Sequence, residues 1–476
     1  MSKDFAFVSS SFEYTRGVLP LAQRLEAHGY RVHWISFRGY ERDWLLENGV
    51  AQSRILDTLG TFDPQRMRAE EVQHELDRLD GGGTPYVNDI ILMDRLLRLK
   101  RDGFAYAYLA HLHRAINHFL QERDIRFVSA GRDTALQIVC AKICARLGIV
   151  SVVPTAIRLP DDRFGFCVGH TEAAFVRFQH AGEAERAQAR AFLRLFRETR
   201  PVPHNVFVER RHNSFLRRLP QDIELYTAFF TRGLHDRGND YTRYSLKKLF
   251  GMYLRRRFNA VHLAVAPPYE PLGSKPFVIY AYHMQPESTV DVLASYFSDQ
   301  PAVIEQIARS LPSDHELYVK PHQDHVGGLG RRQLLALKHI PGVRLVAPFE
   351  SSHELMLRSK AIVTLTGTMS FQGALHGVPS IIFAPQFFGS LPGVHRCASP
   401  LELPAILAKV LAGDRGDHDA EIVEFLALQI ANSFVGRVSP YVDPFSEAEI
   451  GTLIRAYDAA YVKLVAPAAA PALAAG

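Results

Sequence analysis

The sequence predicts an α/β protein with two Rossmann-type, doubly wound domains that face a cleft, and with a helical insertion in the first domain. The length of 476 residues exceeds what one ordinary core needs, so two domains are expected. A strand–helix–strand order recurs in both halves, which indicates parallel sheets. The hydrophobic share of 47% and the charged share of 22% are those of a globular protein.

The first domain is expected over residues 1–265. Short apolar runs predict its strands, and apolar residues at helical spacing predict its helices. The predicted strands cover residues 5–10, 30–35, 125–130 and 149–153, and the predicted helices cover 17–27, 87–122 and 135–147. Residues 172–257 are charged and poor in strand signals, so we expect them to form the helical insertion.

The second domain is expected over residues 275–440. Residues 266–273 hold three prolines and a glycine, which is typical of a linker before it. Its predicted strands cover residues 277–282, 316–320, 342–348, 361–366 and 380–383, and its helices include 302–311, 352–358 and 369–376. A C-terminal helix over 441–465 is expected to cross back to the first domain. The Ala/Pro-rich residues 466–476 are expected to be a disordered tail.

The formal charge of +5 is modest, but cationic residues gather in two clusters. The clusters are Arg210, Arg211, Arg217 and Arg218, and Lys247, Lys248, Arg255, Arg256 and Arg257. They are interpreted either as solvated helix faces or as surfaces that dock on an anionic membrane or a polyanionic glycan. No interleaved aromatic and basic pattern accompanies them, so nucleic acid is not an expected partner.

Four cysteines without a CxxC pair argue against a disulfide scaffold and against zinc. The N-terminal residues lead directly into a strand, and no run of about 18 apolar residues occurs. We therefore expect a cytoplasmic protein, with peripheral association on the inner face of the cytoplasmic membrane as the alternative.

The stretch from 277 to 394 carries four short motifs in order, placed where strands end and helices begin. They are Tyr282-His283-Met284-Gln285-Pro286-Glu287-Ser288, Val319-Lys320-Pro321-His322, Thr366-Gly367-Thr368-Met369-Ser370-Phe371 and Gly377-Val378-Pro379-Ser380. Together they resemble the capsule polysaccharide biosynthesis family, which includes bacterial Kdo transferases with the GT-B fold. A thinner resemblance in the first domain rests on Gly131–Thr134 and on Ile157–Pro160.

This resemblance implies a glycosyltransferase of bacterial surface polysaccharide synthesis, with CMP-Kdo or another CMP-linked ulosonic acid as the favoured donor. The acceptor would be a glycan or glycolipid. The alternatives are a transferase that uses a UDP- or GDP-sugar, a sugar-nucleotide epimerase, and a non-catalytic glycan- or nucleotide-binding subunit of an export complex. Gln323 stands where the family usually has proline and Gln372 where it often has glutamate, which keeps the last alternative open.

Transfer from a nucleotide sugar releases a nucleoside phosphate, so the site must stabilise negative charge. Lys320 and His322 at a strand end would supply a cation and a hydrogen-bond donor. A helix that starts near Gly367 would direct its amides and positive dipole end at an anion. The predicted donor-binding residues are Gln285, Glu287, Ser288, Lys320, His322, Thr366, Gly367, Thr368, Ser370 and Gln372. These groups would act without a metal or another cofactor.

Each of these residues also has a structural interpretation. His322 could cap a strand end, the Thr-Gly-Thr turn could be ordinary loop chemistry, and Gln285 and Glu287 could cap the following helix. His322 and His325 lie three residues apart, but no further ligand cluster is evident nearby. The Gly327–Gly330 run lacks the ending of a phosphate-binding P-loop. The Asp417-His418-Asp419 triplet is similar to the metal-binding Asp-x-Asp motif of other glycosyltransferases. It falls in a polar loop between predicted helices, so we do not expect it to bind a metal.

An inverting transfer also needs a base that deprotonates the acceptor hydroxyl. Asp133 is the first candidate because it follows a predicted strand of the first domain. Its alternative role is that of a helix N-cap. Asp94 and Glu13 are the competing carboxylates.

Overall fold

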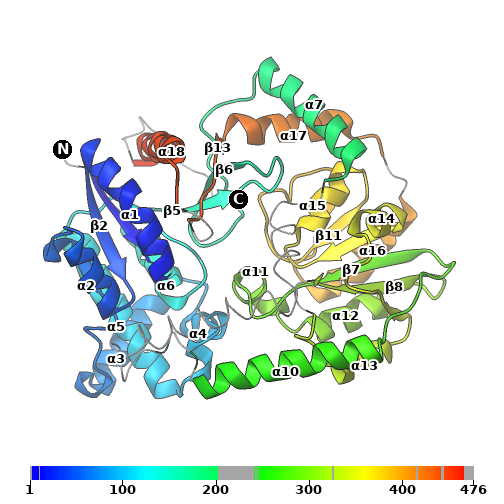
Figure 1. The fold of residues 1–476 in the computed structure, drawn as a ribbon, viewed down its shortest axis with the longest axis horizontal. Coiled ribbons are helices and arrows are strands. Elements are labelled where there is room, and N and C mark those ends of the chain that lie inside the picture. The colour runs from blue at the N-terminus through cyan, green and yellow to red at the C-terminus, as the bar shows by residue number, and fades with distance from the viewer. Residues whose placement is uncertain are drawn as a thin grey trace. The chain divides into compact units, whose positions relative to one another are not determined.

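The computed structural model describes residues 3–9, 11–201, 241, 244, 246–323, 326–413, 416–440 and 444–465 (Figure 1). These residues divide into two compact units. Unit 1 holds the described residues up to Ala181 and from Leu428 onward, and unit 2 holds those from Gly182 to Ala427.

Unit 1 is built on a sheet whose strands are β1 (Lys3–Val8), β2 (Tyr30–Ser36), β3 (Ile55–Asp57), β4 (Phe127–Ser129), β5 (Val150–Ala156), β6 (Arg163–Val168) and β13 (Phe434–Val435). Its helices include α1 (Phe12–Ala27), α2 (Gly39–Glu47), α3 (Ala69–Asp80), α4 (Val87–Met93), α5 (Asp102–Glu122), α6 (Ala135–Leu147) and α18 (Glu447–Val465).

The strand order in unit 1 is β13-β6-β5-β4-β1-β2-β3. The five strands from β5 to β3 pair in parallel, whereas β6 and β13 add an antiparallel edge. Central parallel strands are covered on both faces, and β1 accordingly buries Phe5, Ala6, Phe7 and Val8 completely.

Helix α18 returns to the sheet of unit 1, as expected. Tyr457 from this helix is buried against Phe5 and Phe7, and its hydroxyl lies 2.8 Å from the Ser129 hydroxyl of β4. Lys3 forms an ion pair with Asp458 at 2.9 Å. A capping box, in which the Ser446 amide donates to Glu449 at 2.8 Å, begins the helix.

The long helical region expected over 87–122 consists of α4, a 3-10 turn η3 (Leu97–Leu99) and α5. The cause of this division is Asp94, whose buried carboxylate accepts hydrogen bonds from the amides of Leu96 and Leu97, both at 2.9 Å. An aspartate that bonds nearby amides offers the backbone an alternative to the helix ladder, so the helix ends there.

Unit 2 is built on strands β7 (Phe277–Tyr282), β8 (Glu316–Pro321), β9 (Val343–Leu345), β10 (Ala361–Thr364), β11 (Ser380–Ile382) and β12 (Val394–Arg396). Its helices include α7 (Glu183–Thr199), α10 (Leu246–Val265), α11 (Ser288–Asp291), α12 (Gln300–Arg309), α13 (Arg331–Lys338), α14 (Ser352–Arg358), α15 (Thr368–Leu375) and α16 (Leu403–Ala412). Helix α17 (Asp419–Ala431) contains residues of both units.

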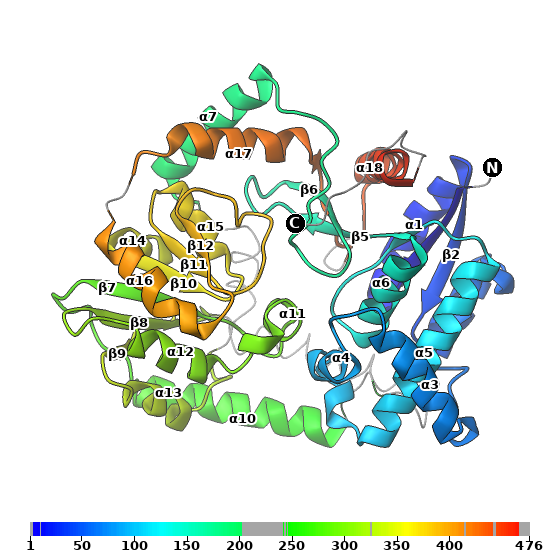
Figure 2. The same ribbon diagram turned by 180° about the vertical axis from the view of Figure 1, so that it is seen from behind.

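All strand pairs in unit 2 are parallel, in the order β12-β11-β10-β7-β8-β9. Successive side chains of a β-strand point to opposite faces of the sheet, so alternate residues of β7 pack in two separate cores. Val278 and Tyr280 pack with α12, α13 and α16, whereas Phe277 and Ile279 pack with α14. Helices therefore cover both faces of this sheet (Figure 2).

Helices α7 and α10 were expected to form an insertion in the first domain, but they belong to unit 2. Arg197 of α7 forms an ion pair with Asp419 at 2.6 Å and donates to the Leu375 carbonyl at 2.8 Å. Residues 266–273 are likewise no linker between the units, because Glu270 forms an ion pair with Arg344 at 2.8 Å inside unit 2. Conversely, residues 428–440 belong to unit 1, since β13 pairs with β6.

The fold class is confirmed for each unit: both contain a doubly wound, Rossmann-type sheet. The cleft between domains stays a prediction. The arginine cluster at 210–218 and the Ala/Pro tail at 466–476 lie outside the described residues. Within the described ranges, no helix is both long enough and apolar enough to cross a membrane.

Candidate functional site

The predicted donor site lies where the strand order of unit 2 reverses direction. The chain starts this sheet at β7, adds β8 and β9 on one side, and then adds β10, β11 and β12 on the other. In open parallel sheets, ligands bind outside the carboxyl ends of the strands at such a switch point. The loops that follow β7 and β10 carry His283 and Thr366, so two of the four sequence motifs meet there.

A turn between β10 and α15 is held in one shape by side chains from both loops. The Leu365 amide donates to His283 Nε2 at 3.1 Å, and the Gly367 amide donates to Thr364 Oγ1 at 3.0 Å. The Thr364 hydroxyl lies 2.8 Å from the hydroxyl of Ser370, which is fully buried. Ser370 is therefore engaged within the protein, and its predicted contact with a donor stays a prediction.

Gly367 occupies the N-cap position of α15. A Cβ atom at this position would lie 3.0 Å from the Thr364 methyl group and 3.2 Å from His283, so the close approach favours glycine. Thr366 is buried and donates to the Thr289 carbonyl at 3.1 Å, which ties the turn to α11. Thr368, the first helical residue, is partly exposed.

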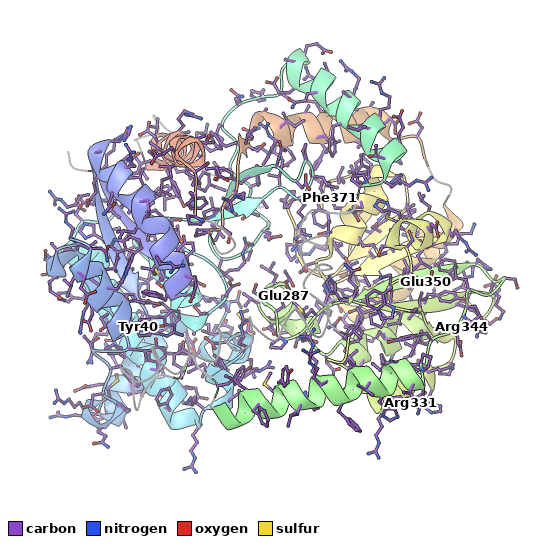
Figure 3. All side chains as sticks on the ribbon, viewed as in Figure 1. Tyr40, Glu287, Arg331, Arg344, Glu350 and Phe371 are labelled. Atoms are coloured by element: carbon purple, nitrogen blue, oxygen red, sulfur yellow. The ribbon has the colours of Figure 1, made fainter. Side chains whose placement is uncertain are left out.

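The loop after β7 is organised by amide side chains. Gln285 Nε2 donates to Asp291 Oδ1 at 3.1 Å and to the Ser298 carbonyl at 2.9 Å, and Gln285 Oε1 accepts from Gln300 at 2.8 Å. Glu287 takes the N-cap position of α11, and Ser288 is its first residue. Figure 3 marks Glu287 there and Phe371 on α15. Glu287 occupies the N-cap position without a side-chain capping hydrogen bond, and its amide donates to Asp291 Oδ2 at 3.0 Å, whereas Gln285 supports the loop itself.

Gln300 is a site residue that the sequence did not reveal. It is fully buried, accepts from the His283 amide at 2.8 Å and from the Tyr280 hydroxyl at 3.1 Å, and donates to the His283 carbonyl at 3.0 Å. The local pattern shows only a helix start after Asp299. Nothing in the sequence around Gln300 indicates its contact with His283, which forms only when the chain folds.

Lys320 lies near the carboxyl end of β8, and His322 directly follows this strand at the same edge of the sheet. The Lys320 side chain is buried and its ammonium donates to the Pro348 carbonyl at 2.6 Å, so this cation is held in place. His322 is exposed. The described residues contain no group of three or more His, Cys, Asp or Glu that could hold a metal, and His325 lies outside them.

Gln372, the residue that departs from the family motif, lies on the buried side of α15. Its side chain is buried and its Nε2 atom has no hydrogen-bond partner. A buried, unpaired amide costs free energy, so this position is suboptimal for stability as it stands.

The three candidate bases occupy different environments in unit 1. Asp133 is partly exposed after β4, and its amide donates to Gln137 at 2.8 Å. The N-cap of α6 is Thr134, so the capping role for Asp133 is wrong. Asp94 is buried, and besides the two amides of its own loop it accepts from the Ala135 amide at 2.9 Å, which makes it a structural group. Glu13 is exposed in the first turn of α1.

Next to Asp133, two arginines share one buried carboxylate. Glu172 lies 3.0 Å from Arg132 and 2.7 Å from Arg158. Burial acts to raise the pKa of Glu172, but the two guanidinium groups outweigh it and hold the pKa below its ordinary value. Both arginines were noted in the sequence, but Glu172 was not, because it follows β6 in a loop without a recognisable pattern.

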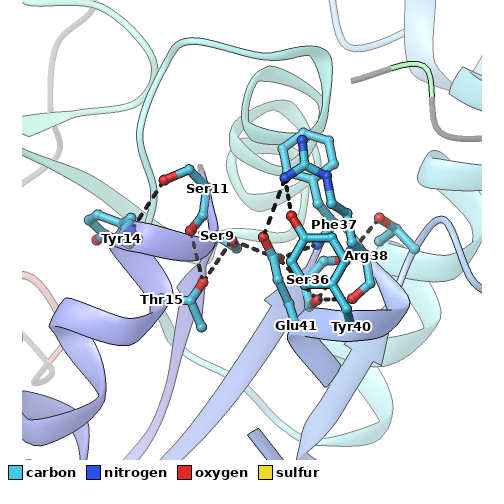
Figure 4. A network of polar contacts seen from close by, with 10 residues as sticks. Ser9, Ser11, Tyr14, Thr15, Ser36, Phe37, Arg38, Tyr40 and Glu41 are labelled. Atoms are coloured by element: carbon cyan, nitrogen blue, oxygen red, sulfur yellow. Dashed lines mark hydrogen bonds and ion pairs between the residues drawn. The ribbon is translucent and has the colours of Figure 1, made fainter. Parts of the chain in front are cut away.

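A second buried carboxylate lies at the ends of β1 and β2 (Figure 4). Glu41 is fully buried and accepts from the Ser9 hydroxyl at 3.0 Å and from the Phe37 amide at 3.2 Å. Burial raises the pKa of Glu41, although Arg38 and these hydrogen bonds oppose the effect. The buried Glu41 carboxyl therefore takes up a proton more readily than an ordinary glutamate.

Comparisons with known proteins do not assign a family. No protein-family model and no curated protein matches the chain. Among solved structures, a putative UDP-N-acetylglucosamine 2-epimerase from Listeria monocytogenes is 12% identical with a TM-score of 0.27, and the alignment covers 98% of each chain. The beta Kdo 2,7 transferase KpsC of Thermosulfurimonas dismutans is 12% identical with a TM-score of 0.31, covering 72% of this chain and 89% of that one.

The glycosyltransferase VinC in complex with dTDP is 14% identical with a TM-score of 0.24, covering 96% and 99% of the two chains. At these values the similarities assign neither a family nor an activity. The resemblance to capsule polysaccharide biosynthesis proteins therefore stays a prediction from the motifs.

Proposed function

We propose that this chain is a glycosyltransferase that binds a nucleotide sugar at the switch point of unit 2. The observation that carries the proposal is the turn from Leu365 to Thr368, held between His283 and Thr364, which presents the start of α15 at the carboxyl edge of the sheet. Helix starts bind anions through amides that lack an acceptor within the helix. Lys320 adds a fixed cation at the same edge.

Loss of the sugar leaves negative charge on a nucleoside phosphate. A dipole and a cation that are already oriented stabilise that charge without reorganisation, which lowers the barrier of the transfer. We assign His322, exposed at the end of β8, as a hydrogen-bond donor to the leaving group. We further assign Asp133 as the base that accepts the proton of the acceptor hydroxyl. These groups would act without a metal ion.

The favoured donor is CMP-Kdo and the favoured acceptor a glycan or glycolipid at the inner face of the cytoplasmic membrane. The motif resemblance is the support for this donor. A UDP- or GDP-sugar transferase and a sugar-nucleotide epimerase are the alternatives on the same scaffold. The unpaired amide of Gln372, where the family often has a carboxylate, favours a further alternative of nucleotide binding without turnover.

Thermal shift with CMP, UDP and GDP tests the donor, because a ligand that binds only the folded protein raises its melting temperature. CMP should stabilise the protein and UDP should not. Release of CMP from CMP-Kdo in the presence of acceptor then tests turnover. Stabilisation by UDP alone would overturn the donor assignment, and binding without turnover would favour the non-catalytic alternative.

His322→Ala should reduce turnover at least 100-fold while the CMP-induced shift persists, since removal of one donor to a developing charge costs about 10²–10³ in rate. The matched control is His339→Ala, an exposed histidine at the end of α13. Near-normal turnover of the His322 variant would show that the catalytic assignment is wrong.

A further inference from the structure

Helix α10 exposes a continuous apolar stripe. The stripe consists of Phe250, Leu254, Phe258, Val261 and Val265, which follow one another at intervals of four, four, three and four residues. This spacing places all five on one face of an α-helix. Their side chains are between 50% and 80% exposed, so the stripe is open along about 22 Å of helix at 1.5 Å per residue.

The opposite face of α10 packs on unit 2. Leu263 is buried in its core, Asn259 donates to the Gly327 carbonyl at 3.0 Å, and Arg256 donates to the Val326 carbonyl at 3.4 Å. Gly327 has a positive φ of 80° and no room for a Cβ against the α10 backbone, so the glycine run lets this helix approach closely. In both views α10 lies along α13 (Figures 1 and 2). The orientation of the stripe is therefore set by packing on the other side.

Cationic residues border the stripe. Arg255 and Lys248 lie toward one side of it on the helix and Arg257 toward the other, and no aspartate or glutamate occurs between Leu246 and Val265. An apolar face with basic flanks and no acidic residue is the pattern of helices that lie in the surface of a bilayer, with apolar side chains among the acyl chains and cations at the headgroups.

We propose that α10 docks this protein on an anionic lipid surface, with the five apolar residues inserted and Arg255 and Arg257 at the lipid phosphates. Charge favours lipid over a second copy of this chain, because two copies of the stripe would bring like charges together. The proposal is independent of the donor that unit 2 accepts. Of the basic cluster noted in the sequence, Lys248, Arg255 and Arg257 border the stripe, whereas Arg256 lies on the face that packs on unit 2.

The test is co-sedimentation of the full-length protein with vesicles of phosphatidylcholine alone or with about one third phosphatidylglycerol. We expect binding to the anionic vesicles only, weakened by salt, as for other basic surfaces. Phe258→Ser combined with Val261→Ser should lower the partition coefficient at least tenfold, and Arg255→Ser combined with Arg257→Ser should do the same for anionic vesicles. Leu401→Ser, at an exposed leucine of the same unit, is the control and should bind normally.

Three results would overturn the proposal. The first is that the wild-type protein fails to bind the anionic vesicles. The second is equal binding of wild type and the Phe258/Val261 variant. The third is a change in that variant without vesicles, either a smaller assembly in size-exclusion chromatography or a clearly lower melting temperature, because it would show that protein covers the stripe. CMP-induced stabilisation of the same variant, expected to be unchanged, separates failure of this proposal from failure of the proposed function.

Discussion

The carboxyl edge of the sheet in unit 1 buries carboxylates, whereas the corresponding edge in unit 2 is held mainly by neutral side chains. In unit 1, Glu41, Asp94 and Glu172 are buried, the last between two arginines. In unit 2, amide and hydroxyl groups make most of the contacts, with Gln300 at the centre and Asp291 and Lys320 as charged members. At the first edge the pKa of Glu41 is raised and that of Glu172 is lowered, so charge there depends on pH, while the second edge offers fixed dipoles.

This difference suits different tasks. The base that we propose, Asp133, must accept a proton during the transfer, and it follows β4 at the edge of unit 1. A site for an anion needs donors whose orientation does not change as charge develops. The two edges thus differ in what a single substitution should do, and four variants test the contrast.

Glu172→Gln should have the largest effect. It leaves Arg132 and Arg158 partly buried without their carboxylate, which should cost unit 1 about 3 kcal/mol in free energy of unfolding. The pKa of Glu172 is lowered, so the stability that it contributes is present above the ordinary glutamate pKa of about 4.3 and is lost as the pH falls further. The variant and wild type should therefore converge at acidic pH in urea denaturation.

The control for this variant is Glu447→Gln, which removes the partner of Arg24 in an exposed pair at 2.8 Å of the same unit. Exposed pairs contribute little, so no measurable change is expected. Equal losses in both variants would contradict the distinction between buried and exposed charge.

Gln300→Leu should follow, with a loss of about 2 kcal/mol in unit 2. The backbone groups of His283 and the amide of Gln285 would lose their partner inside the protein, and each unpaired buried group is costly. Because the same loop supports the proposed nucleotide site, the CMP-induced thermal shift should shrink as well. Gln306→Leu on the same helix is the control, since its Oε1 atom is already unpaired.

Glu41→Gln should change the pH dependence of unit 1 more than its stability at low pH. Because the pKa of Glu41 is raised, wild type loses stability as the pH rises through the interval between the ordinary and the folded pKa. The amide variant does not titrate, so the melting temperature of wild type should fall relative to that of the variant as the pH rises above the ordinary glutamate pKa of about 4.3. A difference in melting temperature that stays constant from acidic to alkaline pH would contradict the raised pKa of Glu41.

Gln372→Met should have the smallest effect, within about 1 kcal/mol of wild type and in the stabilising direction, because it removes an unpaired buried amide of similar volume. The result separates two roles for this residue. If CMP affinity falls at unchanged stability, Gln372 contacts the donor. If both are unchanged, the departure from the family motif is neutral.

Much of the framework was predictable from local patterns. The predicted bounds of β7 and α6 agree with the structure, and those of β8 and β10 differ by one and two residues. Apolar runs that end in polar residues mark buried parallel strands. The helix predicted over 352–358 also agrees with α14, whose Glu354 amide donates to the Ser351 hydroxyl at 3.3 Å.

The contacts that assemble the candidate site were not predictable in this way. Gln300 and His283 are 17 residues apart, and Asp94 bonds an amide 41 residues away. Helix propensity describes α7 and α10 equally well in either unit, which is why they were assigned to the wrong one. Contacts between residues that are far apart in the sequence produce no periodic pattern from which they could be predicted.

The amino-acid sequence alone was therefore sufficient to predict two doubly wound sheets and the strand ends at which Lys320, His322 and Gly367 lie. The reason is that strand periodicity, helix periodicity and helix capping are local properties of the chain. Only the folded chain shows that Ser370 and Thr366 bond within the protein, that Glu172 pairs with two arginines, and that α10 exposes its apolar stripe. Burial and pairing depend on which surfaces meet, and that is a property of the tertiary structure.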